Sequence, residues 1–105
     1  MKQFLYQLTP ARVEMVTVGP TPEEAALVGE HFAYLESLTE RGVMILVGRT
    51  QDNSPDTIGL AIFQAASDED ARAIMENDPA VKNGVMLARL FPFKIALHGQ
   101  WPEAA

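Results

Sequence analysis

The chain has 105 residues, the usual length of a single domain, and its 48% hydrophobic and 21% charged residues are ordinary for a globular protein. Its formal charge of −6, with no cluster of lysine and arginine, argues against nucleic acid as a partner. The absence of cysteine excludes disulfides, thiolate catalysis and cysteine-ligated metal centres, and no apolar run approaches the ~20 residues that cross a membrane.

The first half of the chain predicts a strand, a long helix and a second strand. The apolar and aromatic segment 4–8 predicts the first strand, and residues 11–19 predict a loop or an irregular extension of it. The sequence TPEE at 21–24 has the form of a capping box, with threonine as N-cap and proline at the first helical position. We therefore expect a helix over 22–41, stopped by a glycine, and a short apolar strand over 43–48.

The second half predicts a strand, a helix and a last strand. A polar turn leads into a strand over 58–66, so the second and third strands are expected to form a hairpin. Ser67, followed by three acidic residues, predicts the N-cap of a second helix. The Asp-Pro pair at 78–79 predicts its end, because proline disfavours helical geometry in the residue before it. The last strand, over 85–97, contains Pro92, which indicates a sheet edge or a bulge.

This order of elements, β-α-β-β-α-β, predicts an α+β fold of the ferredoxin-like type. Two right-handed β-α-β units give a four-stranded antiparallel sheet with both helices on one face. The strands are apolar on both faces, so we expect a homodimer in which the two open sheet faces cover each other. A single domain over 1–98 is expected, followed by a tail over 99–105 whose Trp101 could pack onto a partner or onto its own domain.

Five residues of the first predicted helix recur at spacings of three and four, which predicts a stripe that faces the core: Ala25, Val28, Phe32, Leu35 and Thr39. His31 lies at the border of this stripe, from which it could reach a neighbouring helix or a cleft. The N-terminus lacks the apolar stretch and the cleavage site of a signal peptide, so we expect a cytoplasmic protein.

His31 and Asp78 are the only pair with a chemical meaning beyond folding. His31 lies ten residues before the end of the first helix, and Asp78 lies eleven residues after Ser67. At ~1.5 Å per residue these distances are roughly 15 and 16 Å, so antiparallel helices would place the two side chains at the same height. A carboxylate beside an imidazole fixes its tautomer, as general acid/base catalysis requires. The alternatives are a packed histidine and a turn aspartate before proline.

Other candidates give weaker signals. Arg49 could bind a carboxylate or phenolate, whereas a surface salt bridge is the simpler interpretation of Arg89. His98 and the acidic residues Glu30 and Glu36 have no metal-ligand spacing with His31, so no metal is expected. The glycines form no phosphate-binding pattern, and we expect no cofactor.

The chain resembles the YCII-related family over nearly its whole length, about residues 4–97. The matching pieces, in order, are HFAYL at 31–35, a strand that ends in Gly48, SDEDA at 67–71, NDP at 77–79 and Pro92-Phe93. The resemblance implies a ferredoxin-like fold paired as a dimeric α+β barrel, with an active site around His31 and Asp78. Some relatives are associated with dehydrochlorination of a chlorinated hydroxyquinol. The family often has Gly-Pro after the second strand, whereas this chain has Arg49 after Gly48.

Two function hypotheses follow, in different classes. The first is a lyase- or isomerase-type enzyme for a small, aromatic or non-aromatic, organic anion. His31 and Asp78 would be catalytic, and Gly48, Arg49 and Pro79 would bind the substrate. The second is a non-catalytic metabolite-binding or accessory module. A haem- or quinone-handling protein is a third option, for which His98 gives the only hint.

Overall fold

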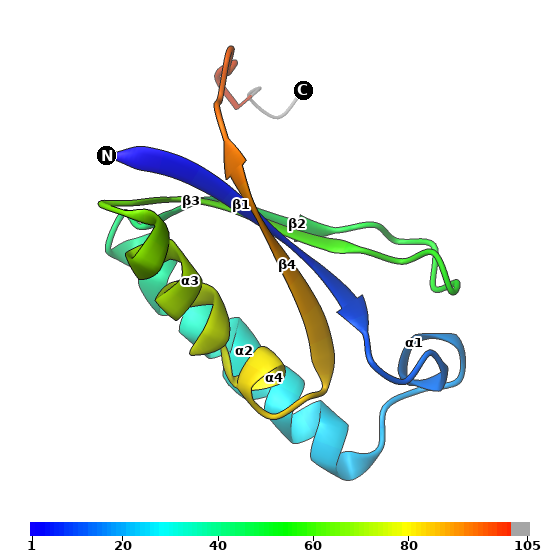
Figure 1. Ribbon diagram of the computed structural model, residues 1–105. Helices are drawn as coiled ribbons and strands as arrows, with labels where there is room; N and C mark the ends of the chain where they lie inside the picture. Colours follow the sequence, from blue (N-terminus) through cyan, green and yellow to red (C-terminus); the bar gives the residue numbers. More distant parts are fainter. Residues whose placement is uncertain (102–105) are drawn as a thin grey trace.

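The computed structural model describes residues 1–101, and residues 102–105 of the predicted tail lie outside the described residues. Its elements follow in chain order (Figure 1): β1 (Lys2–Pro10), α1 (Glu14–Thr17), α2 (Pro22–Glu40), β2 (Met44–Arg49), β3 (Gly59–Ala65), α3 (Asp68–Glu76), α4 (Pro79–Lys82) and β4 (Met86–Phe93).

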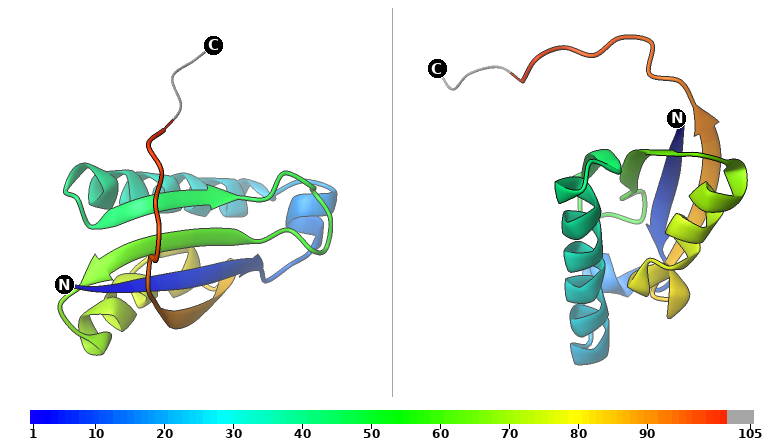
Figure 2. Two further views of the ribbon diagram at one scale, coloured as in Figure 1. Left: turned by 90° about the horizontal axis from the view of Figure 1, so that it is seen from above. Right: turned by 90° about the vertical axis from the view of Figure 1, so that its left-hand side faces the viewer.

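The strands form one antiparallel sheet in the order β2-β3-β1-β4, and β2 and β3 form the predicted hairpin. Both long helices lie behind the same face of the sheet when it is seen from above (Figure 2). This is the ferredoxin-like α+β fold that the order of elements predicted. Pro92 lies in β4, which is an edge strand as expected.

Alternation along the two central strands builds the core. Phe4, Tyr6 and Leu8 of β1 point toward the helices, and so do Ala61, Phe63 and Ala65 of β3. They pack against four residues of the helices, Leu35, Leu38, Ala71 and Met75. One alternating set of side chains therefore carries the hydrophobic core, and Tyr6 brings a hydroxyl group into it.

The N-terminus of α2 is the predicted capping box. The Thr21 hydroxyl accepts from the Glu24 N–H at 3.1 Å, and the Glu24 carboxylate accepts from the Thr21 N–H at 2.8 Å. Gly42, at φ 78°, follows the helix in the left-handed conformation that glycine adopts without strain.

The predicted buried stripe of α2 is correct in part. Leu35 is buried and Val28 is half-buried, whereas Ala25 and Thr39 are exposed and Phe32 is 65% exposed. The inward face lies instead toward the side of His31: Leu38 is buried, and Leu27, His31 and Tyr34 are half-buried. The helix packs against α4 as well as against β2, and its half-buried His31 contacts Asp78, the N-cap of α4.

Three boundaries differ from the sequence prediction. Residues 11–19 contain the turn α1, where a loop or irregular strand was expected. Residues 79–82 form the turn α4, because Asp78 caps it and Pro79 occupies its first position. The last strand ends at Phe93, not at residue 97, since Phe93 pairs with Gln3 almost at the start of β1.

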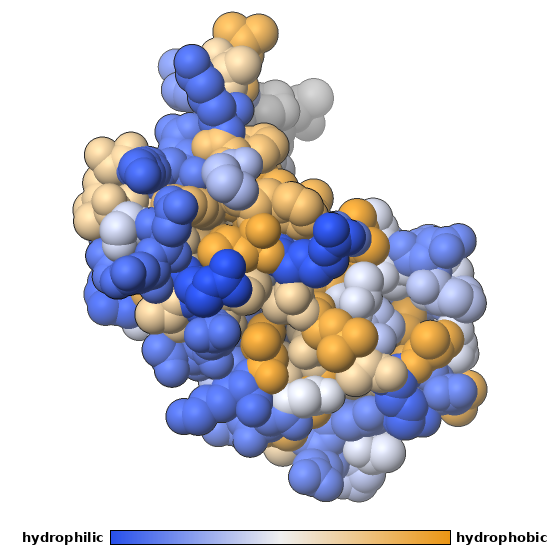
Figure 3. Space-filling model, in the orientation of Figure 1, coloured by the Kyte–Doolittle hydropathy of each residue, from blue (hydrophilic) through white to orange (hydrophobic). Residues whose placement is uncertain are grey.

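The sheet face away from the helices carries exposed apolar side chains. Leu46 and Leu87 are 58% and 59% exposed, and Phe93 is 40% exposed. Figure 3 views the molecule with β4 in front, as in Figure 1, and there apolar patches alternate with hydrophilic ones. Trp101 is 89% exposed to solvent among residues 1–101. Within residues 1–101, no helix combines the length and the apolarity that crossing a membrane would require.

Candidate active site

The structure brings His31 and Asp78 into direct contact. His31 projects from the middle of α2, and its Nδ1 lies 2.7 Å from Oδ1 and 2.8 Å from Oδ2 of Asp78. Asp78 lies in the short connection between α3 and α4, where it is the N-cap of α4. This position brings its carboxylate against His31 of α2. The Asp78 side chain is fully buried and that of His31 is 12% exposed.

Asp78 accepts two further hydrogen bonds. The Tyr6 hydroxyl donates to Oδ2 at 2.9 Å, and the Ala80 N–H donates to Oδ1 at 3.0 Å. The second bond makes Asp78 the N-cap of α4. A buried carboxylate is costly unless donors surround it, and three donors surround this one. The two sequence interpretations of Asp78, turn residue and histidine partner, are therefore true together.

Tyr6 is a donor that keeps its proton. Burial raises the pKa of the Tyr6 hydroxyl far above its ordinary value, and the neighbouring Asp78 charge raises it further. Its contact with Asp78 is therefore a hydrogen bond from a neutral phenol to a carboxylate. Tyr34 of α2 lies nearby, and its hydroxyl donates to the Ile74 carbonyl at 2.7 Å instead.

The hydrogen bonds determine the tautomer that His31 adopts when neutral. Nδ1 carries the proton that Asp78 accepts, so Nε2 keeps its lone pair. His31 lines a cleft, which makes Nε2 the ring nitrogen available to a ligand. A carboxylate on Nδ1 and an available Nε2 are the arrangement of a general base.

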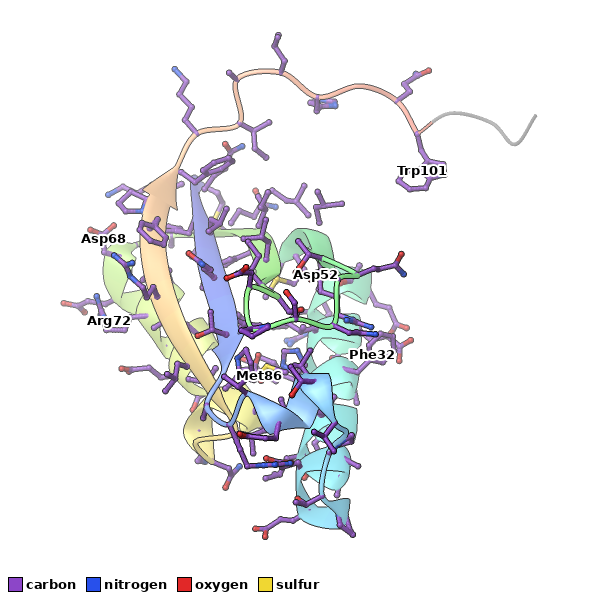
Figure 4. The ribbon with its side chains drawn as sticks, turned by 90° about the vertical axis from the view of Figure 1, so that its right-hand side faces the viewer. Phe32, Asp52, Asp68, Arg72, Met86 and Trp101 are labelled. Carbon is purple, nitrogen blue, oxygen red and sulfur yellow. The ribbon has the colours of Figure 1, made fainter. Side chains whose placement is uncertain are left out.

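The cleft has a volume of about 640 Å³ and lies between α2 and one end of the sheet. Its walls come from α1, α2, the ends of β1 and β2, the starts of β3 and β4, and the loop before β3. Figure 4 looks onto this end of the molecule, with Phe32 on α2, Met86 on β4 and Asp52 on the loop. Most lining side chains are apolar, and the polar ones are His31, Arg49, Asn53 and Thr57.

Polar contacts hold two walls of the cleft. In the loop before β3, Asp52 accepts from the hydroxyls of Ser54, Thr57 and Thr50, which lower the pKa of Asp52 to about 2. At α1, Arg12 makes a two-bond ion pair with Glu24 and also donates to the Gly19 carbonyl.

The ion pair lowers the pKa of Glu24, to about 2, chiefly through the hydrogen bonds from Arg12. Glu24 therefore stays ionised at any pH near neutrality, and Arg12 keeps α1 beside the start of α2.

Comparison with known proteins places the chain in a family. It matches the YCII-related domain over residues 5–94, a stretch that includes His31 and Asp78. This chain belongs to the YCII-related family. The resemblance seen in the sequence motifs is thereby confirmed.

Among solved structures, this YCII-related protein is similar to 5-chloro-2-hydroxyhydroquinone dehydrochlorinase (TftG) from Burkholderia phenoliruptrix AC1100, in complex with 2,5-dihydroxybenzoquinone. The two chains are 24% identical with a TM-score of 0.65, over 88% of this chain and 93% of that chain. At this identity the likeness shows a shared fold. Among curated proteins, none matches this chain.

The expected substrate-binding residues of the YCII-related protein divide into two groups. Gly48 and Arg49 line the cleft at the end of β2. Pro79 is not among the lining residues; it occupies the first position of α4, directly after Asp78. Within residues 1–101, no cluster of histidine and carboxylates could hold a metal ion.

Sequence reasoning missed Tyr6, Asn53 and Thr57. For Tyr6 a signal existed: the alternation of 4–8 places it on the buried face with Phe4, and a buried tyrosine hydroxyl needs a partner. For Asn53 and Thr57 the sequence shows only a polar turn. Their place on the cleft wall depends on how the whole loop folds back.

Proposed function

We propose that this protein is a small lyase- or isomerase-type enzyme that moves a proton on a small organic anion. His31 would be the acid/base and Asp78 would orient it. One observation supports this most: the His31 ring faces a cleft while its Nδ1 is held 2.7 Å from a fully buried carboxylate. Burying a carboxylate beside a cleft histidine is more typical of chemistry than of packing.

The proposed step starts at Nε2 of His31. Its lone pair takes a proton from a C–H or O–H group of the substrate. In an elimination, the electron pair of the C–H bond becomes a new double bond and the leaving group departs with its own pair. In an isomerisation, the same imidazolium returns the proton at another atom. Asp78 stabilises the imidazolium in both cases, because its carboxylate accepts the Nδ1 proton.

The lining of the cleft supports a flat, largely apolar anion as substrate. Arg49 carries the only positive charge among the lining residues, and Gly48 leaves the backbone beside it open. The solved neighbour binds 2,5-dihydroxybenzoquinone, a flat ring with acidic hydroxyl groups. We propose the same chemical class here: a ring or short acid with one anionic group.

Binding of 2,5-dihydroxybenzoquinone tests the ligand class. We expect the wild-type protein to bind it, and Arg49→Gln to weaken binding by about 10- to 150-fold, since a hydrogen bond to a charged group contributes about 1.5–3 kcal/mol. Arg89→Gln is the matched control, because Arg89 stacks on Phe91 and does not line the cleft. Thermal shift and calorimetry measure both. Equal affinities of the two variants would remove Arg49 from the binding site.

A turnover screen, run beside the binding experiment, separates an enzyme from a binding module. A protein that binds ring anions but turns over none of them, in a screen of halogenated and hydroxylated ring acids, would be a non-catalytic module of the family. Turnover that depends on His31 would support the enzyme.

We further propose that two copies pair through their open sheet faces, because these carry exposed leucines that a monomer would leave in water. Light scattering at micromolar concentration is expected to give twice the mass of the chain. Leu87→Glu is expected to give a monomer that still folds, since Leu87 is 59% exposed in the protomer. Val18→Glu, on an 83% exposed residue next to α1, is the control and should stay dimeric. A monomeric wild-type protein would contradict the pairing.

A further inference from the structure

We infer that Tyr6 is a positioning residue of the site: by donating to the carboxylate that holds His31, it sets how strongly His31 retains a proton. The catalytic meaning of this inference rests on the proposed function, but its geometry does not. Tyr6 comes from β1, whereas His31 comes from α2. The two side chains are linked only through Asp78, to which both are hydrogen-bonded. Tyr6 would therefore change the proton affinity of His31 indirectly, through the carboxylate.

The three groups form one chain of hydrogen bonds. The Tyr6 hydroxyl lies 2.9 Å from Oδ2 of Asp78, and Nδ1 of His31 lies 2.8 Å from the same oxygen and 2.7 Å from Oδ1. Tyr6 and Asp78 are both fully buried, so water does not compete for these contacts. Two donors therefore share one carboxylate oxygen inside the protein, where such bonds polarise one another.

Few other groups act on this carboxylate. The titratable side chains around Asp78 are Tyr6 from β1 and His31 and Tyr34 from α2, while α4 contributes the Ala80 N–H. Tyr34 interacts with Asp78 only electrostatically and not through a hydrogen bond, since its hydroxyl donates to the Ile74 carbonyl. Burial and the Asp78 charge raise the pKa of Tyr6, so its hydroxyl stays a donor at and around neutral pH.

The direction of the effect follows from these contacts. Each donor spreads the negative charge of Asp78 and weakens its attraction for the imidazolium proton. Without the Tyr6 hydroxyl, the carboxylate attracts that proton more strongly. His31 should then hold its proton to a higher pH, and a base of this kind would reach full activity at a correspondingly higher pH.

The test is an NMR titration of the two histidines in Tyr6→Phe. We expect the titration midpoint of His31 to rise by roughly 0.5–1 pH unit, which is below the 1–3 units of a charged neighbour. His98 in the exposed C-terminal segment is the internal reference and should not move. Tyr34→Phe is the matched control, because it removes a nearby phenol that does not bond to Asp78. An unchanged His31 midpoint in Tyr6→Phe, or an equal rise in Tyr34→Phe, would overturn the inference.

A second measurement does not depend on how well Tyr6→Phe folds. The chain has two tyrosines, so the Tyr34→Phe protein grown on 3-fluorotyrosine carries the fluorinated phenol at Tyr6 alone. Fluorination makes the phenol a stronger donor, so the midpoint of His31 should fall instead of rise. A shift in the same direction as in Tyr6→Phe would contradict the mechanism.

These results separate this inference from the proposed function. If the midpoint moves as expected and no substrate is ever turned over, the tuning by Tyr6 stands and the enzyme proposal fails. If turnover depends on His31 but its pH profile and its NMR midpoint are the same in Tyr6→Phe, the tuning fails and the enzyme proposal stands.

Discussion

Asp78→Ala is expected to lower the free energy of unfolding by about 3–5 kcal/mol, because it leaves several donors without an acceptor. The Tyr6 hydroxyl and the Ala80 N–H would both stay buried and unpaired, and α4 would lose its cap. His31 would lose the partner of its Nδ1 as well. This is a large share of the 5–15 kcal/mol by which a small domain is stable.

Urea unfolding followed by circular dichroism measures this loss. Asp78→Asn keeps the size of the side chain and one acceptor oxygen, so we expect it to cost about 1–2 kcal/mol. Asp70→Ala is the control, since Asp70 is an exposed acidic residue in the first turn of α3 and should change stability by about 0.3–1 kcal/mol. A loss below about 1 kcal/mol in Asp78→Ala would mean that the hydrogen bonds around Asp78 do not hold the fold together.

His31→Gln is expected to lower the rate of turnover by about 10²–10⁴, the range that general acid/base catalysis contributes. Glutamine keeps an N–H donor that can reach Asp78, so the buried carboxylate need not lose all of its partners. It has no group that takes up a proton near neutral pH. The variant should therefore fold and still bind 2,5-dihydroxybenzoquinone, while the remaining rate loses its dependence on pH.

Kinetics over a pH series, with binding measured in parallel, would check this. His98→Gln is the matched control, since the chain has only these two histidines and His98 lies in the exposed C-terminal segment. Its turnover should equal that of the wild-type protein. Full turnover in His31→Gln, on a substrate that the wild-type protein converts, would exclude His31 as the acid/base.

Local signals predicted the elements of this fold well. The capping box at Thr21, the N-cap at Ser67 and the glycine after α2 act within one turn of helix, so the sequence shows them directly. The order of the elements then leaves few topologies, and the ferredoxin-like sheet is one of them. Counting helical rise also placed His31 and Asp78 at the same height, where the structure has them in contact.

The errors occur where burial depends on a partner far along the chain. Phe32 has the spacing of a core residue and is exposed, whereas His31 beside it lies on the side of α2 that contacts Asp78 before α4. Pro79, expected at the substrate, occupies the first position of α4, and its part in binding stays a prediction. The helix α4 has four residues, and so short a helix leaves no periodic pattern to detect.

The sequence by itself determined the order of strands and helices, the exclusion of cysteine chemistry, and the choice of His31 and Asp78 as the candidate pair. Only the tertiary structure decided that the Tyr6 hydroxyl donates to Asp78, and that Asn53 and Thr57 line the cleft. The reason is physical. Helix caps and strand alternation are interactions between near neighbours in the chain, whereas the bond from Tyr6 to Asp78 joins residues 72 positions apart. Such a bond exists only after the sheet and the helices have packed together.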